Sequence, residues 1–269
     1  MMTMPLTQPL PREDPLFVRS IEKAFRVLSA FGAGRSSLSL AQVAQATGLD
    51  KSAAQRFTHT LERLGYLRKA PETRRFSLTP RTLEPGYHYM RASSILDRAV
   101  PYLLELSRVT EESVSLSVPD GTEIVYVARL ISRHMVSSNV IVGTRLPAYC
   151  TAPGLAMLAR LQLSEAKSVL CKSELRAYTA NTTTSMEELM AKLEQTQRKG
   201  YAMAVEEIFA SDISLGVALT GPRNETLGAV SLSVSRVRLS PEEAEARFAP
   251  LLLATAQAMS AQVLPDGAV

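Results

Sequence analysis

The sequence has few of the residues that build metal sites and disulfide frameworks. Its 269 residues include two cysteines, three histidines and no tryptophan. Cys150 and Cys171 are too few for a disulfide scaffold and lack the spacing of metal ligands. We therefore predict neither a metal nor a cofactor. A reducing cytoplasm is the simplest location for such a chain.

Long apolar runs and catalytic signatures are also missing. No stretch of eighteen apolar residues is present, so we predict no membrane span. The first fifteen residues have no basic start followed by an apolar run, and they are interpreted as a disordered, proline-rich lead-in rather than a secretory signal. The phosphate-binding, dinucleotide, nucleophile-elbow and zinc-protease motifs are all absent from the sequence. We therefore expect a protein that is not an enzyme.

The size and charge of the chain favour two domains of different character. A length of 269 residues exceeds the usual span of one hydrophobic core. Residues 16–81 hold twelve Lys and Arg but four acidic residues, a net charge of +8, whereas residues 82–269 sum to −3. A basic domain beside a mildly acidic one suggests a polyanionic partner for the first. From charge alone, a solvated basic surface is an equally good interpretation.

The basic segment contains a helix-turn-helix pattern. Residues 19–31 place Ile21, Phe25, Leu28 and Phe31 at helical spacing, with Ser20 and Gly32 as expected ends. A short helix follows from Ser39 to Gly48, and a third helix follows Asp50. Two short helices joined by a tight turn that contains glycine are typical of this motif.

The third predicted helix, residues 51–65, carries the candidate base-reading side chains. Its apolar stripe of Ala53, Phe57, Leu61 and Leu64 is expected to face the core, which turns Ser52, Gln55, Arg56 and His59 outward. Gln and Arg can form paired hydrogen bonds with adenine and guanine edges, and Lys51 suits a phosphate. The alternative is an ordinary exposed polar helix face. The predicted DNA-binding residues are Ser39, Lys51, Ser52, Ala53, Gln55, Arg56, His59, Arg74 and Arg75.

A predicted hairpin follows the third helix. Residues 65–80 alternate apolar and polar residues on both sides of a Pro-Glu-Thr-Arg turn, and Arg74 and Arg75 lie near its tip. A hairpin after a recognition helix defines a winged helix-turn-helix. Its basic wing is expected to contact phosphates or the minor groove of double-stranded operator DNA.

At this point the sequence resembles the IclR family of bacterial transcriptional regulators, most closely the PcaR and PobR branch that senses aromatic acids or their ring-cleavage products. The resemblance lies in RSIEKAFRVLSAF, LSLAQVAQATGLDKSAAQRFTHTLERLGYL, RRFSLTPRTLEPG and VGTRLPAYCTAPGLAMLA, and it covers roughly residues 16–262. It implies a homodimer or homotetramer, a DNA-binding head and a GAF-like effector domain. We expect a regulator of a catabolic operon.

The rest of the chain is predicted to form that second domain. Strands are expected at 113–118, 123–129, 134–142, from Tyr201, at 214–221 and at 228–235, with helices at 151–161, 186–199 and 241–262. Antiparallel strands with helices outside give an α+β class. The expected domains are a winged helix-turn-helix domain at 16–81, a linker helix at 82–98 and an effector-binding domain at 99–263.

The predicted effector site combines residue chemistry and resemblance. The N-terminus of the helix that begins near Thr151 is expected to bind a carboxylate. Ser231 and Ser233 are expected on one strand face, near Ser214 on the next strand. The resemblance assigns Ala152 and Pro153 to carboxylate-binding backbone, Met135 to an apolar wall and the three serines to polar pocket positions. Tyr149 is a candidate to pack against a ring of the effector, and Arg133 is a candidate to bind its carboxylate through paired hydrogen bonds. An ordinary surface charge explains Arg133 equally well. The predicted effector-binding residues are Arg133, Met135, Tyr149, Ala152, Ser214, Ser231 and Ser233.

The sequence also departs from the family pattern. Pro153 lacks an N–H, and Ala204 stands where some relatives that sense small 2-oxo acids carry an aspartate, so we expect a larger effector acid. Pro85 suggests a bend in the linker, and Asp212 occupies a position that is apolar in the family. An alternative function is a redox sensor or enzyme that uses Cys150, because a helix N-terminus stabilises a thiolate.

Overall fold

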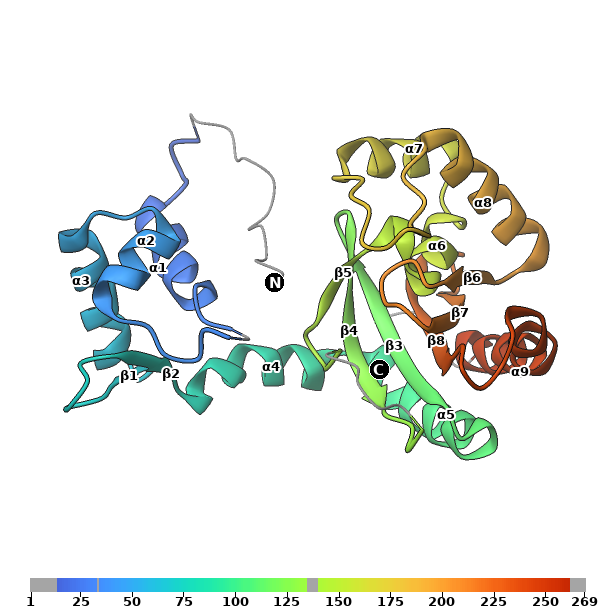
Figure 1. Ribbon diagram of the computed structural model, residues 1–269, viewed down its shortest axis with the longest axis horizontal. Coiled ribbons are helices and arrows are strands. Elements are labelled where there is room, and N and C mark those ends of the chain that lie inside the picture. Colours follow the sequence, from blue (N-terminus) through green and yellow to red (C-terminus); the bar gives the residue numbers. More distant parts are fainter. Residues whose placement is uncertain (1–13, 33, 135–139, 262–269) are drawn as a thin grey trace. The chain divides into compact units, whose positions relative to one another are not determined.

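The computed structural model describes residues 14–32, 34–134 and 140–261, and it divides the chain into two compact units, Met1–Ala92 and Ser93–Val269 (Figure 1). Most of the predicted lead-in, residues 1–13, lies outside the described residues. The structure confirms the predicted α+β class, with an N-terminal helical unit and a C-terminal antiparallel sheet.

The N-terminal unit is a winged helix-turn-helix. Its core gathers Val27, Val43, Leu61, Leu67 and Phe76, all at most 5% exposed. Burying each such side chain contributes about 1.5–3 kcal/mol. Strands β1 and β2 pair antiparallel, from Leu67 opposite Leu78 to Lys69 opposite Phe76. The elements are α1 (Arg19–Ser29), α2 (Leu40–Thr47), α3 (Lys51–Arg63), β1 (Leu67–Lys69), β2 (Phe76–Leu78), a 3-10 turn (Pro80–Leu83) and α4 (Glu84–Ala92).

Capping residues set the ends of α2 and the start of α3. The Ser39 side chain accepts from the Gln42 amide while Gln42 returns a bond to the Ser39 amide. Gly48 ends α2 with φ 66°, a left-handed conformation that favours glycine. The Asp50 carboxylate then accepts from the Ala53 amide at 2.8 Å and begins α3. Local hydrogen bonds therefore fix the ends of the helices on both sides of the predicted turn.

The first helix differs from its prediction. Ile21 and Phe25 are 56% and 58% exposed, whereas Val27, which the predicted stripe omitted, is fully buried. Leu28 and Phe31 of the predicted stripe do pack in the core together with Val27, so periodicity located only the C-terminal half of the buried face. Val18, without a side-chain cap, precedes the helix in place of Ser20.

Helix α4 has no buried residues among its nine. Pro85 lies in its first turn, where a missing N–H costs no intrahelical bond, and a 3-10 turn ends at Leu83 just before it. The interruption falls at Ser93, which separates α4 from α5 (Ser94–Thr110). The predicted linker helix is therefore two helices.

The C-terminal unit is built on a six-stranded antiparallel sheet in the order β5-β4-β3-β8-β7-β6. Its strands are β3 (Ser113–Asp120), β4 (Glu123–Leu130), β5 (Arg145–Pro147), β6 (Ala202–Val205), β7 (Asp212–Thr220) and β8 (Thr226–Ser235). The predicted strand at 134–142 is wrong where the structure describes it, because His134 and residues 140–142 are loop and turn. The edge strand is β5 instead.

Helices cover the two faces of this sheet differently. Helices α5 and α9 (Pro241–Ala261) pack on one face, against Leu116, Leu215, Leu232 and other alternating apolar residues of β3, β7 and β8. Helix α6 (Ala152–Leu158) packs on the other face, with α8 (Met186–Lys199) behind it. Helix α7 (Leu163–Lys172), which the sequence analysis did not predict, follows α6 (Figure 1). No helix among the described residues is long and apolar enough to cross a membrane.

Candidate DNA-binding surface and ligand cavity

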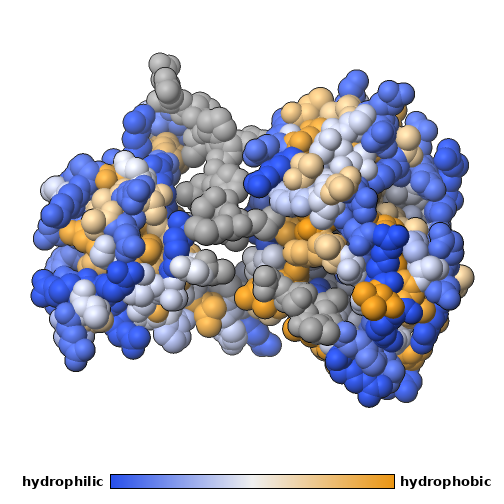
Figure 2. Space-filling model, in the orientation of Figure 1, coloured by the Kyte–Doolittle hydropathy of each residue, from blue (hydrophilic) through white to orange (hydrophobic). Residues whose placement is uncertain are grey.

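The outward face of α3 carries most of the predicted DNA-reading side chains. Ser52, Gln55, Arg56 and His59 are exposed, and Lys51 is exposed at the first position of the helix. Hydrophilic side chains predominate on the face of the N-terminal unit that Figure 2 shows. Ala53 is 6% exposed, because its side chain belongs to the inner face that packs on the core.

The predicted wing residues have different environments. Arg74 is exposed in the turn between β1 and β2, with a positive φ of 57°. Arg75 instead donates from Nε to the Ser37 hydroxyl at 3.0 Å and from a terminal nitrogen to the Ser37 carbonyl at 2.5 Å. These bonds fasten the wing to the loop before α2. Ser39 is engaged in the cap of α2, so Arg75 and Ser39 both hold the fold in place.

The C-terminal unit contains a cavity of about 500 Å³ on the α6 face of the sheet. Its volume is in the range of small-molecule sites. The lining includes apolar side chains and a set of polar side chains from several strands and the segments beside them. These polar residues include Glu112, Tyr126, Arg129, His134, Cys150, Glu207, Asp212, Ser214, Ser233, Ser235 and Arg238.

A β-bulge in β4 brings two large side chains onto the cavity face. Arg129 pairs with Ser115 and Tyr126 pairs with Ser117, which leaves Val127 as the extra residue between them. Ser115 and Ser117 lie on the same face of β3, so Arg129 and Tyr126 also lie on that face of the sheet. In a regular strand, residues three apart would point to opposite faces.

Burial perturbs the ionisable groups of this face. The Arg129 guanidinium donates to the Ser115 hydroxyl at 2.9 Å and lies 5.9 Å from the Tyr126 ring centre. Burial lowers the pKa of Arg129 and raises that of Tyr126 to about 12. Burial also raises the pKa of Asp212 to about 7, against the opposing effect of the nearby Arg129 charge. The cavity therefore holds a poorly hydrated cation beside a carboxyl group that titrates near neutrality.

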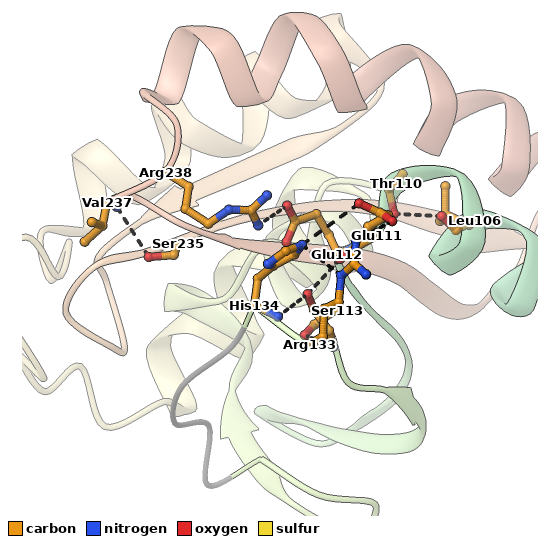
Figure 3. A network of polar contacts seen from close by, with 11 residues as sticks. Leu106, Thr110, Glu111, Glu112, Ser113, Arg133, His134, Ser235, Val237 and Arg238 are labelled. Carbon is orange, nitrogen blue, oxygen red and sulfur yellow. Dashed lines mark hydrogen bonds and ion pairs between the residues drawn. The ribbon is translucent and has the colours of Figure 1, made fainter.

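Two further acids of the lining are held in ion pairs. Glu112, 2% exposed, accepts from Arg238 at 2.6 Å, and Figure 3 shows the two side chains pointing toward each other. Glu207, 3% exposed, accepts from Lys192 at 2.7 Å. These pairs tie the start of β3 to the segment after β8, and the segment after β6 to α8. They fix the wall of the cavity and compensate its negative charge.

The structure brings two of the predicted effector residues to the cavity. Ser214 and Ser233 pair across β7 and β8 and both line it. Ser231 is 4% exposed and pairs with Gly216, next to the start of α6. A Cβ at Gly216 would lie 2.6 Å from the carbonyl carbon of Ala152, so helix backbone covers this part of the sheet.

Two other predicted effector residues, Arg133 and Tyr149, lie elsewhere. Arg133 is exposed and pairs with Glu111 at 2.8 Å, and Figure 3 shows this pair beside His134. The buried Tyr149 hydroxyl donates to the Arg176 carbonyl at 2.5 Å and accepts from the Arg176 amide at 2.8 Å, which fastens the segment after α7. Neither residue is among the described residues that line the cavity. Met135 lies outside the described residues.

The start of α6 offers little to a carboxylate. Pro153 has no N–H, the Gly154 amide donates to the Thr151 hydroxyl, and the Leu155 amide donates to the Thr151 carbonyl. Ala152 is fully buried. The positive group that faces the cavity is instead Arg129, which the sequence analysis missed because the bulge of β4 has no signature in the residue pattern.

Cys150 lines the cavity, but its chemistry differs from the expectation. Burial raises the pKa of its thiol to about 12, so the thiol is protonated near neutrality. The expected stabilisation of a thiolate at the helix start is therefore wrong. Among the residues that the structure describes, no group of His, Cys, Asp and Glu could hold a metal ion.

An exposed recognition helix with a wing, and a separate unit with a polar cavity, define a DNA-binding regulator with a ligand-binding domain. The family description "IclR helix-turn-helix domain" matches residues 20–71, and "Bacterial transcriptional regulator IclR C-terminal" matches residues 87–261. The chain belongs to the IclR family of bacterial transcriptional regulators and is a DNA-binding transcriptional regulator rather than an enzyme.

Individual relatives agree with this assignment. The chain is 30% identical over 251 residues to the Pca regulon regulatory protein of Pseudomonas putida, covering 93% of this chain and 86% of the relative. It is 28% identical over 245 residues to the p-hydroxybenzoate hydroxylase transcriptional activator of Acinetobacter baylyi, covering 89% and 90%. A transcriptional regulator from Rhodococcus sp. RHA1 has a similar structure, with a TM-score of 0.79 and 35% identity, covering 91% and 98%.

Proposed function

We propose that this regulator controls a catabolic operon in response to an aromatic or related carboxylic acid bound in the cavity of the C-terminal unit. The observation that carries the proposal is the half-buried Arg129 guanidinium in a cavity lined by the hydroxyls of Ser214 and Ser233. A desolvated guanidinium favours a carboxylate as a planar, bidentate partner. The two relatives named above act on a Pca regulon and on a p-hydroxybenzoate hydroxylase gene, which supports an aromatic acid.

A thermal-shift screen tests this effector class. Benzoate, 4-hydroxybenzoate and adipate are compared with benzamide, which has the ring but not the charge. We expect at least one acid to raise Tm. The rise should be lost in Arg129→Gln and kept in the matched variant Arg133→Gln, whose side chain is exposed. No shift with any acid, or an equal shift with benzamide, would contradict the proposal.

We also propose how the head reads DNA. In a dimer, two α3 helices enter successive major grooves of a palindromic operator, where Gln55, Arg56 and His59 face base edges. Lys51 and the exposed Arg74 contact phosphates. Lys51→Ala should weaken binding to operator and random duplex alike and reduce the salt dependence by about one phosphate contact. A loss confined to the operator would assign Lys51 to base reading instead. A regulator of this kind acts on the chromosome, so we infer a cytoplasmic location.

Exposed apolar residues support a homodimer or homotetramer. Leu16, Val18, Ile21 and Phe25 are between 52% and 87% exposed on and before α1. Such a patch is typical of an interface. Light scattering after gel filtration should show a multiple of the 29.3 kDa chain, and Phe25→Lys should reduce the mass. The matched variant Leu163→Lys, at a residue 54% exposed on α7, should not. A wild-type monomer would contradict the proposal.

A further inference from the structure

The charges that surround the cavity do not all remain available to a ligand. The carboxylates of Glu112 and Glu207 are already paired with Arg238 and Lys192 at 2.6 and 2.7 Å. In the described part of the chain, the Asp212 carboxyl group makes no ion pair within 4.0 Å. Arg129, whose guanidinium donates to the Ser115 hydroxyl, and the ionisation of Asp212 both contribute to the charge that an incoming anion meets.

The strand register places Asp212 on the same polar face as the rest of the site. Asp212 pairs with Ser235, and Ser214 pairs with Ser233, so these four side chains share the cavity face of β7 and β8. Arg129, from β4, is the cation close enough to influence Asp212. An ionised Asp212 cancels this positive charge, and it repels a carboxylate in a confined, poorly hydrated space.

We propose that the cavity binds its acid effector together with one proton, with Arg129 holding the carboxylate and Asp212 holding the proton. The proposal rests on the proposed function, since it needs an anionic effector. The proton passes from solvent to a carboxylate oxygen of Asp212, where the resulting hydroxyl can donate a hydrogen bond to the bound acid. One negative charge enters with one positive charge, so the buried site keeps its net charge.

Tyr126 and Cys150 also face the cavity, but they do not supply this proton near neutrality. Burial raises the pKa of Tyr126 and that of Cys150 to about 12, so both are already protonated. Glu112 and Glu207 are neutralised by their partners. His134 also lies at the cavity, near Glu111, and the experiment must separate it from Asp212.

Proton coupling predicts a specific pH dependence. Only the fraction of molecules with a protonated Asp212 is competent, and the apparent affinity scales with that fraction. Because burial raises the pKa of Asp212 to about 7, the affinity for an acid should change little below pH 6. It should fall about tenfold per pH unit well above neutrality. The effector response would then depend on pH in the physiological range.

Isothermal titration calorimetry of the full-length protein with benzoate, 4-hydroxybenzoate and adipate between pH 6 and 8.5 tests the proposal. Titrations in phosphate and in Tris, whose ionisation enthalpies differ, count the protons taken up. At pH 8 we expect nearly one proton per acid bound for wild type. Asp212→Asn should bind with no uptake and no pH dependence, whereas Asp97→Asn, an exposed carboxylate on α5, should behave as wild type.

Each outcome decides a separate claim. Binding of an acid without proton uptake in wild type would overturn the proton coupling but leave the effector class intact. Uptake that persists in Asp212→Asn and disappears in His134→Gln would overturn the assignment to Asp212. No binding of any acid at any pH would overturn the proposed function, and this proposal with it. Should Asp212→Asn fail to fold, the wild-type proton count and a ¹³C titration of the Asp212 carboxyl still decide, and an ordinary aspartate pKa would refute the proposal.

Discussion

Substituting Gly216 with alanine tests the contact that closes the α6 side of the sheet. The added Cβ would lie 2.6 Å from the Ala152 carbonyl carbon and from the Pro153 nitrogen, whereas ordinary contact begins at 3.4 Å. These are backbone atoms that cannot rotate away. Helix α6 must therefore move from the sheet by about 0.8 Å or the strand must bend. Overpacking of this kind costs about 1–3 kcal/mol.

This cost converts into a measurable change. In a unit of this size, each kcal/mol lowers Tm by about 2–4 °C, so Gly216→Ala should lower the Tm of the C-terminal unit by about 2–12 °C in a calorimetric scan. Gly86→Ala is the matched control, because a Cβ at Gly86, in helix α4, meets no atom within 4 Å. Its Tm should stay level or rise slightly. If Gly216→Ala melts within 1 °C of wild type, the reasoning about this contact is refuted.

Three further predictions concern the two sites. Arg56→Ala should weaken operator binding by about 1–3 kcal/mol in fluorescence anisotropy at fixed salt, whereas Lys167→Ala on α7 should not. Equal operator affinities for Arg56→Ala and wild type would show that Arg56 does not read bases. Cys150→Ser should keep the effector response in a reporter assay, because the buried thiol is protonated. Loss of the response with the fold intact would instead favour a redox sensor or enzyme that uses Cys150. Burial raises the pKa of Asp212 to about 7, so the folded state binds more protons than the unfolded state between about pH 4 and 7. The free energy of unfolding should therefore fall as pH rises through that window, and it should fall less in Asp212→Asn. Identical pH profiles of urea unfolding for the two proteins would contradict this.

The elements that could be predicted from the sequence are those whose ends are fixed by local hydrogen bonds. Ser39 and Asp50 cap helices whose polar faces can be counted off directly, so the exposure of Gln55 and Arg56 followed from spacing alone. Alternating serines likewise indicated the strand face to which Ser214 belongs.

The failures occurred where tertiary packing chooses between local alternatives. The stripe predicted for the first helix holds for Leu28 and Phe31 but not for Ile21 and Phe25. Packing against α2 and α3 brings Val27 into the core instead. Arg133 and Arg129 are both arginines near the end of β4, yet a bulge that depends on pairing with β3 directs Arg129 inward. The predicted carboxylate site at the start of α6 has fewer amide donors than expected, because Pro153 has no N–H and the Gly154 amide donates to the Thr151 hydroxyl.

The extra residue of β4 has a consequence for comparing regulators of this kind. Deleting Val127 would restore plain alternation and turn either the tyrosine or the arginine of this strand to the opposite side of the sheet. If the arginine turned away, a relative that lacks one residue here would lose this positive charge from its cavity wall, even if every flanking residue matched. We therefore expect a single-residue gap at this position to change the charge that the cavity presents to a ligand.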